Sequence, residues 1–308
     1  MAKIAFVFPG QGAQKVGMGK AAFDASEVAR QTFGQADAAL GESLSTLCFE
    51  GPESELVLTA NSQPAIVCTS IALQRDLGET CDMAAGHSLG EYSAHVCAGT
   101  LSFEDAVRLV RKRGQYMQEA VPVGVGAMAA VLGGDLAAIE QACTDTPGVV
   151  EPVNYNCPGQ LVIAGEKPAV DAATERIVGL GAKVRPLSVS APFHSSLMKP
   201  AEERFAPDLR AVAFAAPTFP VYVNVDACAA TDAEGARDAL VRQVSRPVRW
   251  EQLIRKMIAD GVTLFVEIGP GKALTGMIRR IDRTVARANV ESPADFDAAR
   301  KAIAEARG

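Results

Sequence analysis

The sequence predicts an α/β fold in which a mainly parallel sheet carries a smaller inserted unit. A short apolar run from Met83 enters a Gly-His-Ser-Leu-Gly turn at 86–90, and a helix-like segment leaves the turn. A second apolar run, at 3–8, reads as a buried strand that ends in a glycine-rich loop. From residue 127 the pattern changes to short strands around two short helices. These three observations together favour strand–turn–helix units on one sheet, with a ferredoxin-like β-α-β-β-α-β unit set into them.

The loop after the first strand, Pro9 to Gln14, resembles a nucleotide-binding fingerprint only in part. Gly10 and Gly12 fit, but Lys15 stands where the third glycine is required. Such a loop can instead donate backbone N–H groups to an oxyanion. We therefore expect it to serve acyl chemistry rather than nucleotide binding.

The turn at 86–90 predicts a nucleophile elbow with Ser88 at its apex. Gly86 and Gly90 would let strand and helix backbones approach more closely than side chains allow. The turn would expose the Ser88 hydroxyl and aim the first free amides of the helix at its target. An ordinary glycine-flanked turn serine is the alternative, and the strand and helix on either side favour the elbow of an α/β-hydrolase-like core.

The remaining elements follow from apolar spacing along the chain. Helices are expected at 20–40, 62–77, 91–97 and 103–119, and in the small unit at 135–144 and 167–180. Strands of the small unit are expected at 127–132, 149–155, 161–164 and 183–189. After the loop at 190–195, helices are expected at 199–212, 234–244 and 250–260, strands at 221–225 and 263–268, and an alanine-rich helix at the end. The predicted division is a catalytic unit of 1–123 and 190–308 and an inserted unit of 124–189.

Composition excludes several classes of function. The 308 residues carry a net charge of −6, which argues against general nucleic-acid binding. No apolar run reaches the ~18–20 residues of a membrane span, and no signal segment is expected at the start. The seven cysteines show no metal-binding or disulfide spacing and indicate a reducing cytoplasm. Gly269 to Lys272 lacks the upstream glycine and the Ser/Thr of a phosphate loop. No metal site and no cofactor are expected.

A serine hydroxyl needs a base, and the chain holds only three histidines. The side chain of His87 diverges from its neighbour Ser88, and His95 lies about 10 Å along the helix. His194, in the loop where the small unit returns to the large one, is therefore the expected base. No Asp stands out between 88 and 194, so a plain esterase triad fits poorly, and a carbonyl group could orient the imidazole instead.

Seven motifs resemble the family of malonyl-CoA:acyl carrier protein transacylases, in order and over nearly the whole chain. They are FVFPGQGAQ at 6–14, AGHSLGEYSA at 85–94, RKRGQYMQEAVPVGVGAM at 111–128, NCPGQLVIAG at 156–165, APFHSSLMKP at 191–200, NVD at 224–226 and EIGPGKALTGM at 267–277. The resemblance implies an S-malonyltransferase with ping-pong acyl transfer through a malonyl-serine at Ser88, with His194 as base and then acid. It also implies an oxyanion hole from the backbone N–H groups of Gln11 and Leu89, and a Gln243 carbonyl that orients the histidine.

The same resemblance assigns the substrate contacts. Arg113 matches the arginine that binds the free carboxylate of the malonyl group; the alternative is one more solvated arginine on a helix face. Phe193, before the histidine, matches members that take malonyl rather than methylmalonyl groups. Arg279 and Arg280 are candidate contacts for acidic acyl carrier protein, with a solvated helix face as the alternative.

Two other functions stay open at this point. A serine hydrolase, either an esterase or a thioesterase, would use the same Ser88 and His194, and a carrier-protein scaffold with a dead site would need neither. The expected partners are malonyl-CoA as substrate and acyl carrier protein. We expect the protein to act as a monomer, although the sequence carries no signal for its oligomeric state. It does not distinguish fatty-acid from polyketide synthesis.

Overall fold

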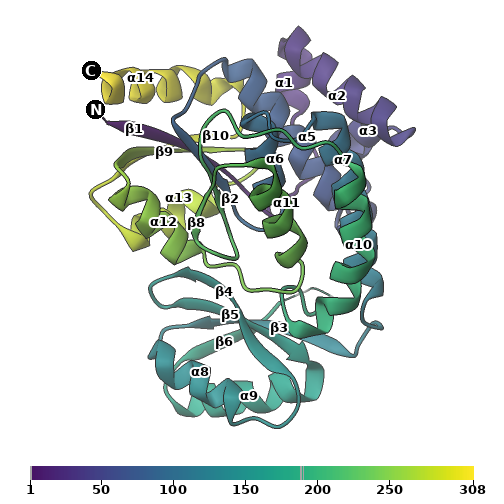
Figure 1. Cartoon of the computed structure of the whole chain (residues 1–308), viewed down its shortest axis with the longest axis vertical. Coiled ribbons are helices and arrows are strands. Elements are labelled where there is room, and N and C mark those ends of the chain that lie inside the picture. Colours follow the sequence, from purple (N-terminus) through teal and green to yellow (C-terminus); the bar gives the residue numbers. More distant parts are fainter. Residues whose placement is uncertain (1, 188, 190) are drawn as a thin grey trace.

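The computed structural model in Figure 1 describes residues 2–187, 189 and 191–308, and Met1, Ser188 and Ser190 lie outside the described residues. Two separate sheets organise these residues. The first has the strand order β10-β9-β1-β2-β7-β8, and the second has the order β4-β5-β3-β6. The predicted α/β fold class, with a parallel sheet and a second small unit, is confirmed.

The first sheet is parallel except for its last strand, which pairs antiparallel to β7. Its strands are β1 Lys3–Phe8, β2 Met83–Gly86, β7 Val221–Val223, β8 Cys228–Ala230, β9 Val262–Ile268 and β10 Ala286–Val290. Residues 4–8 of β1 are fully buried, because helices cover both faces of the sheet. Ile4, Phe6 and Phe8 face one hydrophobic cluster, whereas Ala5 and Val7 face another.

Helices form the two outer layers of the large unit. They are α1 Lys20–Ala25, α2 Glu27–Leu40, α3 Leu44–Glu50, α4 Glu53–Leu56, α5 Thr59–Leu77, α6 Gly90–Cys97, α7 Phe103–Glu119, α10 Lys199–Ala211, α11 Ala233–Arg242, α12 Trp250–Ala259, α13 Ala273–Ile281 and α14 Phe296–Arg307, with short 3-10 turns at Ser196–Met198 and Pro293–Asp295. Helices α2, α5, α6, α7 and α14 contribute to the cluster around Phe6. Helices α12 and α13 cover the opposite face.

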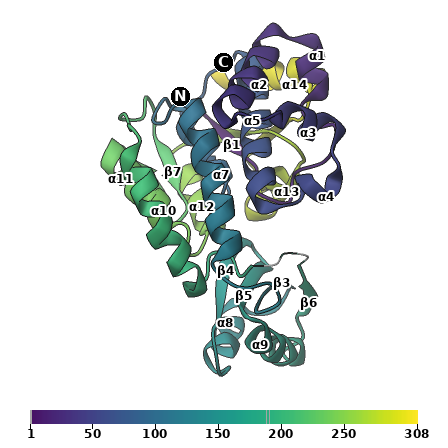
Figure 2. The same cartoon turned by 90° about the vertical axis from the view of Figure 1, so that its right-hand side faces the viewer.

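The second sheet forms the small unit, which lies below the first sheet in Figures 1 and 2. Its elements are β3 Gly126–Leu132, α8 Leu136–Thr144, β4 Val150–Cys157, β5 Gln160–Glu166, α9 Lys167–Gly179 and β6 Lys183–Pro186. The strands are antiparallel, and α8 and α9 pack on one face around Ile139, Ile163 and Ile177. The element order is the predicted β-α-β-β-α-β order. The division of the chain at residues 124 and 189 stays a prediction.

Several predicted bounds differ from the structure. The helix expected over 20–40 is two helices, because the Ser26 side chain accepts a hydrogen bond from the Ala29 amide and caps α2. The strand expected over 183–189 ends at Pro186, and Ser188 and Ser190 lie outside the described residues. The strand expected over 221–225 ends at Val223, which leaves Asn224 at the carboxyl edge of the sheet. The sequence reasoning did not identify α3, α4, β8 or β10.

Candidate active site

Ser88 lies at the apex of a strained turn between β2 and α6. Its φ is 50°, in the left-handed region that side chains rarely adopt. A Cβ on Gly86 would lie 1.9 Å from the Gly90 carbonyl carbon, and a Cβ on Gly90 would lie 2.0 Å from the Phe8 oxygen. Only glycine fits at both positions, because the strand, the helix and the end of β1 meet there. The turn therefore has the close backbone approach that the sequence predicted.

Asn224, which follows β7, fixes this turn from the neighbouring strand. Its Oδ1 accepts a hydrogen bond of 2.6 Å from the Ser88 amide, and its Nδ2 donates to the Gly86 oxygen over 2.7 Å. The carboxyl ends of parallel strands meet at one edge of a sheet, which explains why residues 136 positions apart are neighbours. Because the Ser88 amide already has a partner, it is not a free donor for an oxyanion.

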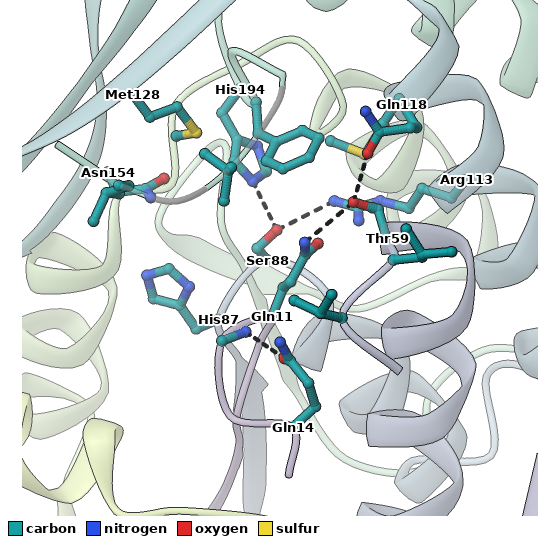
Figure 3. A pocket seen from close by; sticks show the side chains of 17 residues that line it. Gln11, Gln14, Thr59, His87, Ser88, Arg113, Gln118, Met128, Asn154 and His194 are labelled. Carbon is teal, nitrogen blue, oxygen red and sulfur yellow. Dashed lines mark hydrogen bonds between the residues drawn. The ribbon is translucent and has the colours of Figure 1, made fainter. Parts of the chain in front are cut away.

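His194 is in hydrogen-bond contact with Ser88. Ser88 Oγ lies 2.7 Å from His194 Nε2, and His194 Nδ1 lies 2.8 Å from the Gln243 backbone oxygen. A dashed line marks the contact between Ser88 and His194 in Figure 3. A carbonyl oxygen only accepts, so Nδ1 carries a proton, and the neutral ring offers Nε2 as acceptor to the serine hydroxyl. Burial, and then the positive charge of Arg113, lowers the pKa of His194 to about 3. The imidazole is thus neutral, with an unprotonated Nε2 that faces the serine hydroxyl.

The other two histidines have different partners. His87 Nε2 lies 2.8 Å from Asn156 Oδ1, and its ring packs against Trp250 with centroids 5.5 Å apart. His95 is fully buried in α6, and burial lowers its pKa to about 3. His95 Nε2 is 4.0 Å from a carboxylate oxygen of Glu91. Of the three rings, only that of His194 is hydrogen-bonded to Ser88.

Arg113 is buried beside the serine although it belongs to an Arg-Lys-Arg run on α7. The residue is 2% exposed. Its Nη1 donates to Gln63 Oε1 over 2.9 Å, and its Nη2 donates to Gln243 Oε1 over 2.9 Å and to Ser88 Oγ over 3.2 Å. Among the described residues its Nε has no hydrogen-bond partner. A guanidinium positioned in this way leaves N–H groups for a carboxylate next to the Ser88 hydroxyl.

The neighbouring arginines of α7 differ from Arg113. Arg108 is exposed and forms an ion pair with Asp105 on its own helix. Arg111 contacts Glu42 and Asn61 rather than Ser88. The description of a solvated arginine therefore fits Arg108 and does not fit Arg113.

Gln11 and Leu89 carry the two predicted oxyanion donors. Gln11 lies near Ser88 in Figure 3, and Leu89 follows Ser88 in the chain. In the part of the chain that the structure describes, the backbone N–H groups of Gln11 and Leu89 have no hydrogen-bond acceptor. The Gln11 side chain donates to Thr59 Oγ1 over 3.2 Å, and that hydroxyl donates to Gln118 Oε1 over 3.1 Å. This chain of hydrogen bonds, visible in Figure 3, ties the loop after β1 to α5 and α7.

A cavity of about 640 Å³ opens above the Ser88 side chain. Gln11, Thr59 and Arg113 line it from the large unit, and Met128 and Asn154 line it from the small sheet. Phe193 and His194 complete the wall, and Phe193 is 8% exposed. A cavity of this size holds a small acyl group with part of the thiol arm that carries it.

The predicted docking residues lie outside this cavity. Arg279 and Arg280 are both exposed in the last turn of α13. Arg280 donates to the Pro158 oxygen, in the turn after β4, over 3.1 Å and to Gln160 Oε1, at the start of β5, over 3.3 Å. Among the described residues Arg279 has no hydrogen-bond partner. Their contact with a carrier protein stays a prediction.

Sequence reasoning missed three side chains of the site. Gln63 and the side chain of Gln243 hold Arg113, and Asn224 holds the serine turn. The NVD motif contained Asn224, but its position at the sheet edge follows only from the pairing of β2 with β7. No group of three or more His, Cys, Asp or Glu side chains in the described part of the chain could hold a metal ion.

Comparison with known proteins places these features in context. Residues 5–301 match the acyl transferase domain family. The chain is 47% identical to a malonyl CoA-acyl carrier protein transacylase of Bacillus subtilis, over 99% of this chain and 98% of that one. It is 48% identical to the protein of the same name from Escherichia coli K12, over 97% and 99%.

The chain is also similar to solved structures of proteins with related names. An acyl carrier protein S-malonyltransferase from Vibrio cholerae superposes with a TM-score of 0.94 at 46% identity, covering 97% of this chain and 100% of that one. A malonyl-transacylase in complex with its type II PKS acyl-carrier protein superposes with a TM-score of 0.95 at 45% identity, covering 98% and 100%.

Proposed function

This chain belongs to the acyl transferase domain family, and from that membership and the site we propose that it transfers malonyl groups from malonyl-CoA to acyl carrier protein. The observation that carries the proposal is the position of Ser88 Oγ, 2.7 Å from His194 Nε2 and 3.2 Å from Arg113 Nη2. A nucleophile, its base and a carboxylate-binding cation converge on one point. The similar proteins named above support malonyl as the acyl group and carrier protein as the acceptor.

In the first half of the reaction, His194 Nε2 takes the proton of the Ser88 hydroxyl as Oγ attacks the thioester carbonyl. The carbon–sulfur bond then breaks, and the CoA sulfur leaves with the proton that His194 held. The malonyl group remains on Ser88 as an ester. The Gln243 carbonyl keeps the ring in the tautomer that this step requires and stabilises the imidazolium.

In the second half, the phosphopantetheine thiol of the carrier protein gives its proton to His194 Nε2. Its sulfur attacks the ester carbonyl, and Ser88 Oγ leaves with that proton. In both halves the backbone N–H groups of Gln11 and Leu89 would hold the oxyanion, and one such donor is typically worth about 10²–10³ in rate. The transfer consumes no cofactor, since malonyl-CoA is a substrate.

Arg113 and Phe193 would select the acyl group. Arg113 would hold the malonyl carboxylate through two N–H groups, a geometry that a lysine cannot reproduce. Phe193 would crowd an α-methyl branch from the cavity wall that carries His194. A methyl group in such a pocket is worth about 1–3 kcal/mol, so the preference for malonyl over methylmalonyl groups would be strong but not absolute.

A serine hydrolase is the competing function, and Arg113 argues against it. A pocket for plain esters would leave a buried guanidinium without its carboxylate, which is unfavourable. A carrier-protein scaffold with a dead site would not need the complete set of Ser88, His194 and Arg113. The site therefore favours acyl transfer over both alternatives.

The proposal also covers the oligomeric state and the location of the protein. We infer that one chain suffices, because every residue of the proposed mechanism comes from the same polypeptide. We also propose a cytoplasmic location, because all seven cysteines are free thiols. None of the helices in the described residues is long and apolar enough to cross a membrane.

The experiment that tests the proposed function is a two-step intact-mass series. The protein is mixed first with malonyl-CoA and then with carrier protein bearing phosphopantetheine. We expect a malonyl adduct in the first step and its complete movement to the carrier protein in the second. Loss of the adduct to water at the same rate with and without carrier protein would identify a hydrolase instead.

A further inference from the structure

We propose that Glu91 is a positioning residue that orients the Gln243 side chain and, through it, the Arg113 guanidinium. This inference rests on the proposed function, because it concerns how the enzyme prefers acyl groups that carry a carboxylate. Glu91 has no part in the proton transfers described above. It is fully buried, three residues after Ser88 in the first turn of α6.

Gln243 contacts His194, Arg113 and Ser88. Its backbone oxygen accepts from His194 Nδ1 over 2.8 Å, and its Oε1 accepts from Arg113 Nη2 over 2.9 Å. Its Nε2 donates to the Ser88 backbone oxygen over 3.0 Å and to Glu91 Oε2 over 2.9 Å. The side chain thus lies between the serine turn, the guanidinium and the Glu91 carboxyl group.

These partners allow only one orientation of the Gln243 amide. The Ser88 carbonyl and Glu91 Oε2 face its Nε2, and each accepts a hydrogen bond there. Arg113 faces its Oε1 and can only donate. A rotation by 180° would turn NH₂ toward a guanidinium and Oε1 toward two oxygens. Glu91 and the Ser88 carbonyl therefore both enforce the orientation in which Gln243 accepts from Arg113.

Glu91 is itself held in place. Its Oε2 accepts a second hydrogen bond of 2.8 Å from the backbone N–H of Asn224, the residue that fixes the serine turn. Its other oxygen has no hydrogen-bond partner among the described residues. Glu91 Oε2 accepts both hydrogen bonds, from Asn224 and from Gln243, and the side-chain oxygen of a glutamine at this position could accept them as well. The proposed role therefore needs the oxygen of Glu91 and not its charge.

Removal of that oxygen should lower the rate of malonyl loading more than the rate of acetyl loading. Without Glu91 the Gln243 amide loses one of its two acceptors and holds Arg113 less firmly. His194 is less affected, because it bonds the backbone carbonyl of Gln243 and not its side chain. The malonyl group has a carboxylate for Arg113 to bind, and the acetyl group has none. The ratio of the two rates therefore reports on positioning, whereas general damage to the serine turn would lower both.

The test measures kcat/KM for serine loading from malonyl-CoA and from acetyl-CoA in the full-length chain. We expect Glu91→Leu to lower the malonyl-to-acetyl ratio roughly tenfold, as for one lost hydrogen bond in a buried site. The matched control is Glu91→Gln, which keeps the shape and the acceptor oxygen and should keep the ratio within about threefold. An unchanged ratio in Glu91→Leu, or an equal loss in Glu91→Gln, would overturn the proposal.

A second substitution keeps the test decisive if Glu91→Leu does not fold. Gln243→Leu removes the amide and leaves the backbone carbonyl, so it should lower the same ratio roughly tenfold. In Glu91→Gln/Gln243→Leu the ratio should equal that of Gln243→Leu within about threefold. If Gln243→Leu leaves the ratio unchanged, the positioning role is wrong. Failure of the proposed function differs from this, since the unaltered chain would then not load malonyl at all.

Discussion

Replacement of Arg113 by alanine should remove the preference for acyl groups that carry a carboxylate while leaving the serine chemistry in place. Arg113 is 2% exposed, so a carboxylate bound to it is withdrawn from water. Acetyl-CoA lacks this group, and its loading uses only Ser88, His194 and the oxyanion donors. Arg113→Ala should therefore affect malonyl loading far more than acetyl loading.

The size of the effect follows from the burial of the pair. Removal of one partner of a buried ion pair costs about 3–5 kcal/mol, because the other charge is left buried and unpaired. At 1.36 kcal/mol for each factor of ten, this lowers kcat/KM for malonyl-CoA by about 10²–10⁴. Arg113→Lys should lower kcat/KM for malonyl-CoA less than Arg113→Ala does, since an ammonium keeps the charge. It should still be slower than the unaltered chain, because an ammonium cannot form the two parallel hydrogen bonds.

The assay is serine loading followed by intact mass, with the two thioesters measured separately. Arg108→Ala is the matched control, because Arg108 lies exposed on the same helix and contacts Asp105 and the Ala39 carbonyl rather than Ser88. It should leave both rates unchanged within about twofold, as for other exposed ion pairs. Equal losses of malonyl and acetyl loading in Arg113→Ala would refute the carboxylate-binding role.

Three further predictions concern acyl selectivity, the pKa of the base and the docking of carrier protein. Phe193→Ser should raise methylmalonyl loading relative to malonyl loading by about 10–100-fold, measured by competition between the two thioesters; no change would remove Phe193 as a selectivity residue. Reaction of Ser88 with a fluorophosphonate should have an acid limb well below pH 6.5, because burial and the Arg113 charge lower the pKa of His194. Arg113→Ala removes a positive charge that disfavours the imidazolium, so the limb should move to higher pH, and a limb that stays fixed or falls would contradict this electrostatic effect. Arg279→Glu should slow transfer to carrier protein in a salt-dependent way and leave loading unchanged, whereas unaltered transfer would make that helix end a plain solvated surface.

Local sequence patterns were sufficient to predict the serine turn and the core strands. The glycines around Ser88 indicate a close approach of backbones. This approach involves only residues near Ser88 in the sequence and the end of the buried strand β1. The order of strands and helices in the small unit, from β3 to β6, likewise follows from apolar spacing. The assignment of His194 needed only the small number of histidines and the position of its loop.

Contacts between distant segments could not be predicted in this way. Gln63 and Asn224 carry no local signal, because each acquires its partner when separate elements pack together. The burial of Arg113 likewise could not be predicted from a run of three basic residues, and only the family resemblance identified Arg113 as a site residue. The short edge strands β8 and β10 were missed, since segments of three and five residues are too short to show a periodicity.

The most direct test of the account is the location of the acyl group after a brief reaction with malonyl-CoA. Peptide mass mapping should find the malonyl mass on Ser88 alone, and Ser88→Ala should show no adduct on any peptide. A full adduct that persists in Ser88→Ala, or that maps to another residue, would contradict the proposed acyl-serine intermediate.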